Sequence, residues 1–141
     1  MPLTPETTKV LLIDDHQLTR SLLRGLLKNE GYHQFREAAD APSGLKIATH
    51  FSPDLVCLDV QMPGKTGLDM LAELREAVPH AVILMVTAQN DRDTVVACIN
   101  AGAHGYIVKP FNALTIIKVI EGALAKRGLL AAPAAGAPAR K

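Results

Sequence analysis

Short apolar runs recur along the chain at nearly even spacing, and most contain consecutive Val, Ile and Leu. Uninterrupted runs of this kind are typical of strands covered on both faces, as in a parallel sheet. The second run is the weakest, because most of its residues are polar. The five expected strands are KVLLID (9–14), HQFREA (33–38), DLVCLD (54–59), AVILMVT (81–87) and HGYIVK (104–109).

The segments between these runs have helical periodicity. Thr66 with Asp69 three residues later forms a capping box for the third helix, and Pro79 closes that helix. Regular alternation of strand and helix predicts one open, doubly wound α/β domain with helices on both faces of the sheet. The expected helical segments are LTRSLLRGLLKNEGY, a shorter one near 42–51, TGLDMLAELREAVP, DRDTVVACINAG and FNALTIIKVIEGALAKRG.

The first helical segment has an apolar and a basic side. Its basic residues, spaced four apart, should form a solvated face, and Gly31 should end the segment. A docking role for a phosphate donor stays open, since this helix borders the strand ends. The expected apolar stripe is Leu18, Leu22, Leu23, Leu26 and Leu27, and the basic residues opposite it are Arg20, Arg24 and Lys28.

Composition narrows the class of protein. The 141 residues suit a single core, and the net charge of +1 gives no global field that would attract nucleic acid or an acidic membrane. Cys57 and Cys98 lie in apolar segments without a C-x-x-C spacing, which indicates packing residues. No apolar run is long enough to span a membrane. We therefore expect a soluble, cytoplasmic domain over 8–127, followed by a flexible Ala/Pro-rich tail or linker over 128–141.

Polar side chains stand where the expected strands end. Asp14 and Asp15 follow the first strand, Asp59 ends the third, Thr87 the fourth and Lys109 the fifth. In doubly wound sheets, chemistry gathers at these carboxyl ends. Three neighbouring carboxylates repel one another, so the group requires either protonation or a cation, and oxygen ligands suit Mg²⁺. The set predicts a magnesium site at which phosphoryl transfer onto Asp59 forms an acyl phosphate.

Four motifs in this order carry a resemblance to a known family. VLLIDDH, PDLVCLDVQMPG, VTA and GYIVKPF resemble the receiver domain of two-component response regulators. The resemblance implies a flavodoxin-like (βα)5 fold with strand order 2-1-3-4-5. It implies that Asp59 accepts the phosphate, that Asp15 binds Mg²⁺ directly and Asp14 through water, and that the backbone carbonyl of Gln61 completes the protein ligands.

The same resemblance implies a switch. Lys109 should bind a phosphoryl oxygen, and its bond to Pro110 should be cis. Thr87 should move to hydrogen-bond the phosphate, which lets Tyr106 turn inward from a solvent-facing position. The surface of the fourth helix, fifth strand and fifth helix should then change. The expected signal is thus a change in surface conformation. The domain should promote only its own phosphorylation and dephosphorylation.

The implied partners are a histidine kinase or histidine phosphotransfer protein and an unidentified downstream protein, with no nucleic acid bound by this domain. Dimerisation on phosphorylation stays open, as does a DNA-binding region beyond the linker. Gln61 and Gln89 lie where they could orient or block hydrolytic water, so the lifetime of the phosphorylated state stays open too.

Two other functions compete with a receiver. A magnesium-dependent phosphohydrolase with an aspartyl nucleophile would need an acid where Gln61 stands, and a flavin phosphate would meet repulsion from the acidic loop after the first strand. The histidines show no metal spacing, so all are expected to be surface or turn residues. They are His16, His33, His50, His80 and His104.

Overall fold

The computed structural model describes residues 3–62, 64, 66–88 and 92–126. The expected tail over 128–141 and Gln89 lie outside these residues. The strands are β1 Lys9–Ile13, β2 Gln34–Ala38, β3 Leu55–Asp59, β4 Val82–Ala88 and β5 Gly105–Lys109. The helices are α1 Gln17–Lys28, α2 Ala41–Phe51, α3 Gly67–Ala77, α4 Arg92–Asn100 and α5 Ala113–Lys126. All strand pairs are parallel and their order is β2-β1-β3-β4-β5, which confirms the expected fold.

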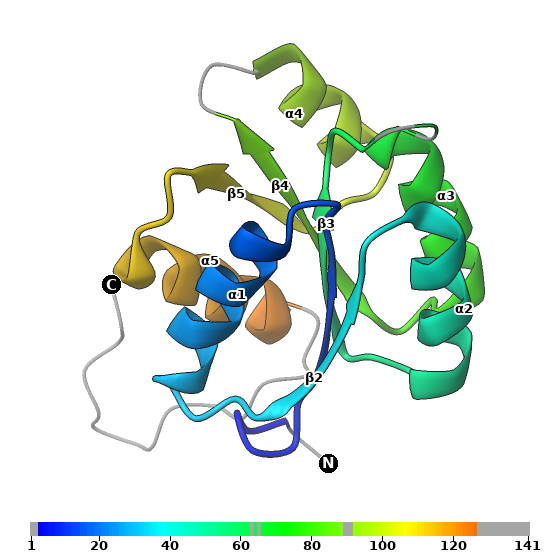
Figure 1. Cartoon of the computed structure of the whole chain (residues 1–141). Helices are drawn as coiled ribbons and strands as arrows, with labels where there is room; N and C mark the ends of the chain where they lie inside the picture. The colour runs from blue at the N-terminus through cyan, green and yellow to red at the C-terminus, as the bar shows by residue number, and fades with distance from the viewer. Residues whose placement is uncertain (1–2, 63, 65, 89–91, 127–141) are drawn as a thin grey trace.

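The molecule has three layers (Figure 1). Helices α1 and α5 cover one face of the sheet, and α2, α3 and α4 cover the other. Successive strand residues point to opposite faces, so neighbours such as Leu11 and Leu12 belong to different apolar clusters. Burial on both sides explains why the central strands are continuous apolar runs rather than alternating ones.

Side-chain caps fix where helices begin. The Asp40 carboxylate accepts a hydrogen bond from the Ser43 backbone N–H at 2.8 Å at the start of α2. The Thr66 hydroxyl accepts one from the Asp69 backbone N–H at 3.2 Å at the start of α3, as the sequence predicts. Each cap satisfies a backbone donor that has no partner within its helix.

The first helix corrects one expectation, because its five leucines do not form a single buried stripe. Leu23 and Leu27 are buried, but Leu18 is 72% and Leu22 54% exposed. At about 100° per residue the five leucines span about 180° of the helix, which is wider than the part that can contact a sheet. Only the side centred on Leu23 and Leu27 reaches the core.

Cys57 and Cys98 are both buried and free, as expected of packing residues. Burial raises the pKa of the Cys57 thiol to about 12, which keeps it protonated and unreactive at neutral pH. Among the helices that the structure describes, none combines the length and apolar character required to cross a membrane.

A close backbone contact joins α3 to the end of β3. Gly67 is the first residue of α3, and its N–H donates to the Val60 carbonyl at 2.9 Å. A Cβ built on Gly67 would lie 2.7 Å from the Val60 Cα and 2.9 Å from the Asp59 carbonyl oxygen. These are backbone atoms that no rotamer change can move, so a glycine at this position lets α3 begin directly beside the last residue of β3.

We expect Gly67→Ala to lower the free energy of unfolding by about 1–3 kcal/mol, because the added methyl group must displace the backbone at Val60. Gly122→Ala in α5 is the matched control, since a Cβ there meets nothing within 4 Å. Alanine favours a helix, so the control should be neutral or gain up to about 1 kcal/mol. Urea unfolding measures both, and equal effects would contradict the close contact.

Candidate functional site

Strand register brings the polar strand ends together. Ile13 lies opposite Leu58, and Asp59 opposite Val86. The residues that follow β1 are therefore neighbours of Asp59 at one edge of the sheet. Ala88 pairs with Lys109, which brings the end of β5 to the same edge. The adjacent strands β1 and β3 thus supply the acids, and the edge strand β5 supplies the amine.

Three carboxylates form a tight cluster at this edge. Ligand oxygens of Asp14, Asp15 and Asp59 lie within 4.8 Å of one another, together with a ring nitrogen of His16. Asp14 is 5% and Asp59 4% exposed, so two of these acids are withdrawn from water. The Asp59 Oδ1 accepts the backbone N–H of Gln61 at 3.3 Å. The structure thus brings together the acids that the sequence selects.

The cluster is electrostatically costly. Burial raises the pKa of Asp59 to about 6, the negative charges of Asp14 and Asp15 add to the rise, and Lys109 and the Gln61 N–H oppose it. Lys109 Nζ lies 3.8 Å from Asp14 Oδ2 and 3.8 Å from Asp59 Oδ1. Within the part of the chain that the structure describes, one ammonium group lies beside two carboxylates, so these side chains carry excess negative charge at neutral pH.

The donor set fits a divalent cation. Within the part of the chain that the structure describes, Asp14 Oδ2 and Asp15 Oδ1 are buried and accept no hydrogen bond. Buried oxygens without a donor are unfavourable in a protein interior, whereas a cation satisfies them. Carboxylate oxygens a few ångströms apart are the ligands that a hard ion such as Mg²⁺ prefers.

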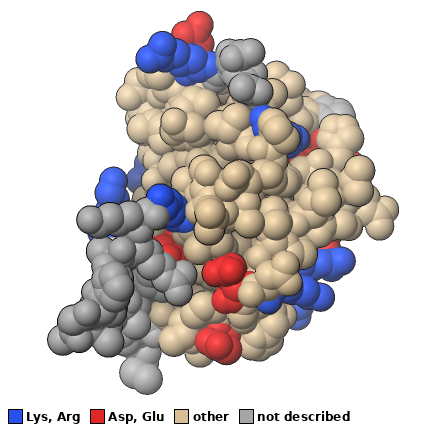
Figure 2. Space-filling view, turned by 90° about the vertical axis from the view of Figure 1, so that its left-hand side faces the viewer, with Lys and Arg blue, Asp and Glu red and all other residues tan. Residues whose placement is uncertain are grey.

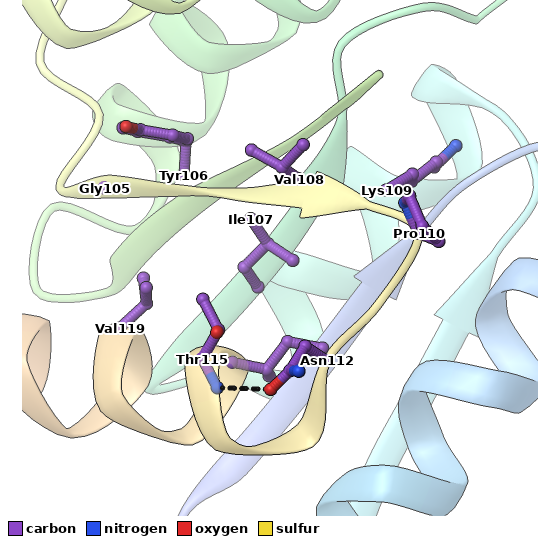
Figure 3. A pocket seen from close by; sticks show the side chains of 10 residues that line it. Gly105, Tyr106, Ile107, Val108, Lys109, Pro110, Asn112, Thr115 and Val119 are labelled. Carbon is purple, nitrogen blue, oxygen red and sulfur yellow. Dashed lines mark hydrogen bonds between the residues drawn. The ribbon is translucent and has the colours of Figure 1, made fainter. Parts of the chain in front are cut away.

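Lys109 connects the acidic pocket to the end of β5. Its peptide bond to Pro110 is cis, as the resemblance implies. Figure 3 shows Lys109 at the strand end, with Tyr106 and Val108 on one face of β5 and Ile107 on the other, toward α5. A groove between β5 and α5 is lined by residues that include Tyr106, Lys109 and Thr115.

Thr87 and Tyr106 have the positions expected of them before phosphorylation. Thr87 is 2% exposed, and its hydroxyl donates to the Ala88 carbonyl at 3.4 Å. Tyr106 is 44% exposed and faces solvent. The structure contains one conformation, so the coupled movement of these residues remains a prediction.

His16 is exposed, as expected of a surface residue, but sequence reasoning missed its contacts with the acidic cluster. Its Nδ1 lies 3.1 Å from Asp15 Oδ1 and 3.4 Å from Asp14 Oδ1. Its position directly after the Asp-Asp pair was the available signal. His104 departs from the expectation of a surface residue, because it is partly buried and its Nδ1 accepts the Ile83 backbone N–H at 3.0 Å.

The basic side of α1 is also not wholly solvated. Arg20 is 13% exposed, and its Nε lies 2.9 Å from Glu37 Oε1 in β2. Arg24 pairs with the other oxygen of Glu37. Arg20 also donates to the backbone carbonyl of Asp14 at 2.6 Å. Because Arg20 follows the buried leucines around the helix, it fastens α1 to β2 and to the acidic loop.

Comparison with known proteins matches this geometry to one family. Residues 10–121 match the response regulator receiver domain. The chain belongs to the response regulator receiver family. It is 36% identical to the chemotaxis protein CheY of Pseudomonas aeruginosa over 115 residues, which cover 80% of this chain and 93% of that protein. Membership favours a receiver domain over the aspartyl phosphohydrolase and flavin-binding alternatives.

Receiver domains like this one occur alone and within longer proteins. The transcriptional regulatory protein PdtaR of Mycobacterium tuberculosis is 37% identical over 118 residues, which are 84% of this chain but 57% of PdtaR. NtrX of Brucella abortus, solved in complex with ATP, superposes with a TM-score of 0.82 at 34% identity, covering 88% of this chain and 28% of NtrX. A receiver domain from Clostridium thermocellum gives 0.78 at 30% identity, covering 86% of this chain and 98% of that one.

The charge of Asp59 should destabilise the receiver domain in the absence of a cation. Its folded-state pKa of about 6 exceeds its ordinary value of 3.8, so the stability it contributes is present below pH 3.8 and is lost as the pH rises through about 6. We expect Asp59→Asn to be more stable than the native chain by about 1–2 kcal/mol at neutral pH, and by much less near pH 4.

Urea unfolding at both pH values, with chelator present, measures this difference. An equal difference at the two pH values would show that the charge is not its cause. Added Mg²⁺ should stabilise the native chain more than the asparagine variant.

Removing Arg20 should destabilise the receiver domain more than removing Arg24. Arg20→Ala leaves the Asp14 carbonyl without its side-chain donor and Glu37 without its more buried partner, which should cost about 2 kcal/mol. Arg24 is 38% exposed, so Arg24→Ala should cost under about 1 kcal/mol. Equal losses in urea unfolding would mean that the contact with the acidic loop contributes nothing.

Proposed function

We propose that this receiver domain accepts a phosphoryl group on Asp59 from a histidine kinase or a histidine phosphotransfer protein. The observation that carries the proposal is the buried carboxylate cluster with Lys109 beside it. In the transfer, an Asp59 oxygen attacks phosphorus, a P–O bond forms and the P–N bond to the donor imidazole breaks. The leaving ring nitrogen takes the electron pair and then a proton.

The side chains of Asp14, Asp15 and Asp59, with the backbone carbonyl of Gln61, would hold Mg²⁺. The ion supplies positive charge that neutralises the carboxylates and the phosphoryl oxygens. Lys109 contributes a second positive charge from β5, within 4 Å of two of the acids. The burial of Asp59 also limits access of water to the acyl phosphate. We propose that turnover is confined to the domain's own phosphoryl group.

The output surface that we propose is formed by α4, β5 and α5. Apolar side chains are exposed there, and they are Val96, Ile99, Tyr106, Val108 and Leu114. On the side of the molecule where β5 and α5 lie, Figure 2 shows uncharged atoms over much of the surface, with acidic groups below the centre of the view. A downstream protein that contacts this surface would sense the inward movement of Tyr106 that follows when Thr87 bonds to the phosphate. A phosphorylation-dependent dimer could use the same surface.

Phosphorylation from a small donor tests the assignment of Asp59. With acetyl phosphate or phosphoramidate and Mg²⁺, intact mass spectrometry should show one added phosphoryl group on the native chain and none on Asp59→Asn. Excess chelator should abolish the gain, and Lys109→Ala should reduce it strongly.

Asp54→Asn is the control for this experiment. Asp54 precedes the opposite end of β3, where its carboxylate accepts the Lys9 backbone N–H at 2.9 Å, so this variant should still be phosphorylated. A mass gain that persists in Asp59→Asn would place the phosphate on another residue and contradict the proposal.

A further inference from the structure

His16 lies at the start of α1 without acting as a cap. It occupies the N-cap position with an extended backbone, φ −100° and ψ 113°, and its side chain makes no capping hydrogen bond. Its backbone N–H donates to Asp14 Oδ1 at 2.8 Å. This contact fixes the backbone of His16 beside the acidic cluster and leaves the imidazole ring free for another role.

The ring nitrogen converges with the carboxylates. Nδ1 lies 3.1 Å from Asp15 Oδ1, but this oxygen accepts no hydrogen bond within the described residues, so the pair lacks the alignment of an N–H···O bond. Two donors on one octahedral ion with bonds of about 2.1 Å are separated by about 3 Å when adjacent. The Nδ1–Oδ1 separation of 3.1 Å matches that expected of two adjacent ligands on one ion.

We propose that His16 supplies a nitrogen ligand to the divalent ion held by Asp14, Asp15 and Asp59, and so makes the site selective for transition metals. Imidazole nitrogen binds Co²⁺, Ni²⁺ and Zn²⁺ well, whereas Mg²⁺ prefers oxygen. Mg²⁺ therefore uses the acids alone, and a borderline ion gains the bond to His16. The inference rests on the proposed function only in requiring that the acids hold a divalent ion.

An alternative role for His16 is a simple countercharge to the acids. A protonated imidazole beside Asp14 and Asp15 would oppose every cation, so its removal would tighten Mg²⁺ and Co²⁺ binding alike. If His16 is a nitrogen ligand, its removal should instead weaken Co²⁺ binding and leave Mg²⁺ binding nearly unchanged. The ratio of the two affinities therefore separates the roles.

Calorimetric titration of the full chain with Co²⁺ and, separately, with Mg²⁺ tests the proposal. His16→Ala and His16→Gln should weaken Co²⁺ binding about 10- to 100-fold and change Mg²⁺ binding less than about threefold. The ring of His16 is 67% exposed, so both variants should keep the thermal midpoint of the native chain. His33→Ala is the control, because His33 is exposed and precedes β2 at the opposite edge of the sheet.

Histidine-ring NMR gives a readout that is independent of affinity. Co²⁺ should shift and broaden the ring signals of His16 strongly and those of His33 little, whereas Mg²⁺ should leave the His16 ring nearly unchanged. Equal effects of His16→Ala on both ions, or no effect on Co²⁺, would overturn the proposal. Mg²⁺ binding and phosphorylation of the native chain would in that case still support the proposed function. Failure of the native chain to bind either ion would overturn the acidic metal site itself, and with it the proposed function.

Discussion

Repulsion among three carboxylates at one edge of the sheet is the constraint around which the receiver domain is organised. Parallel strands bring Asp14 and Asp15 beside Asp59, and burial of the group raises the pKa of Asp59 to about 6. Among the described residues, a single ammonium, that of Lys109, lies 3.8 Å from two of these acids, and it cannot balance all three. The fold thus maintains a deficit of positive charge, which any bound cation relieves. Because the repulsion among the acids is unfavourable without a cation, it favours binding of a cation at this edge.

Such a site needs a rigid scaffold, and the two apolar clusters provide it. Each central strand is buried on both faces, so the strand ends cannot separate to reduce the repulsion without exposing core residues. Close contact of Gly67 with the backbone of Val60 fixes α3 at the end of β3. On the other side, Arg20 binds the Asp14 carbonyl and Glu37, which connects α1, β2 and the acidic loop. Core packing offsets the electrostatic cost of the site.

The sequence pattern was sufficient to predict the strands, the helices and the acids at the strand ends. Strands buried on both faces give continuous apolar runs, and the polar residues that end them are visible in short stretches of sequence. Strand order came from the family resemblance. The side chains around α1 were predicted less well. Leu18 and Leu22 were placed in the apolar stripe of α1 although they are exposed, since a five-leucine stripe exceeds the width of one helix face. The contact of Arg20 with Glu37 depends on which elements meet in space, and no spacing along one helix contains that information.

Lys109 links the acidic pocket to the surface. It lies beside Asp14 and Asp59, and it also lines the groove between β5 and α5 as well as a second groove against α1. A phosphoryl group on Asp59 adds negative charge beside this ammonium and must alter its position or its partners. Lys109 ends β5, which also carries the exposed Tyr106 and Val108, so in the proposed switch a shift at the acid would reach an exposed apolar surface along one short strand. The same side chain therefore lies beside the acids in the pocket and borders both grooves, which is the position that such coupling would require.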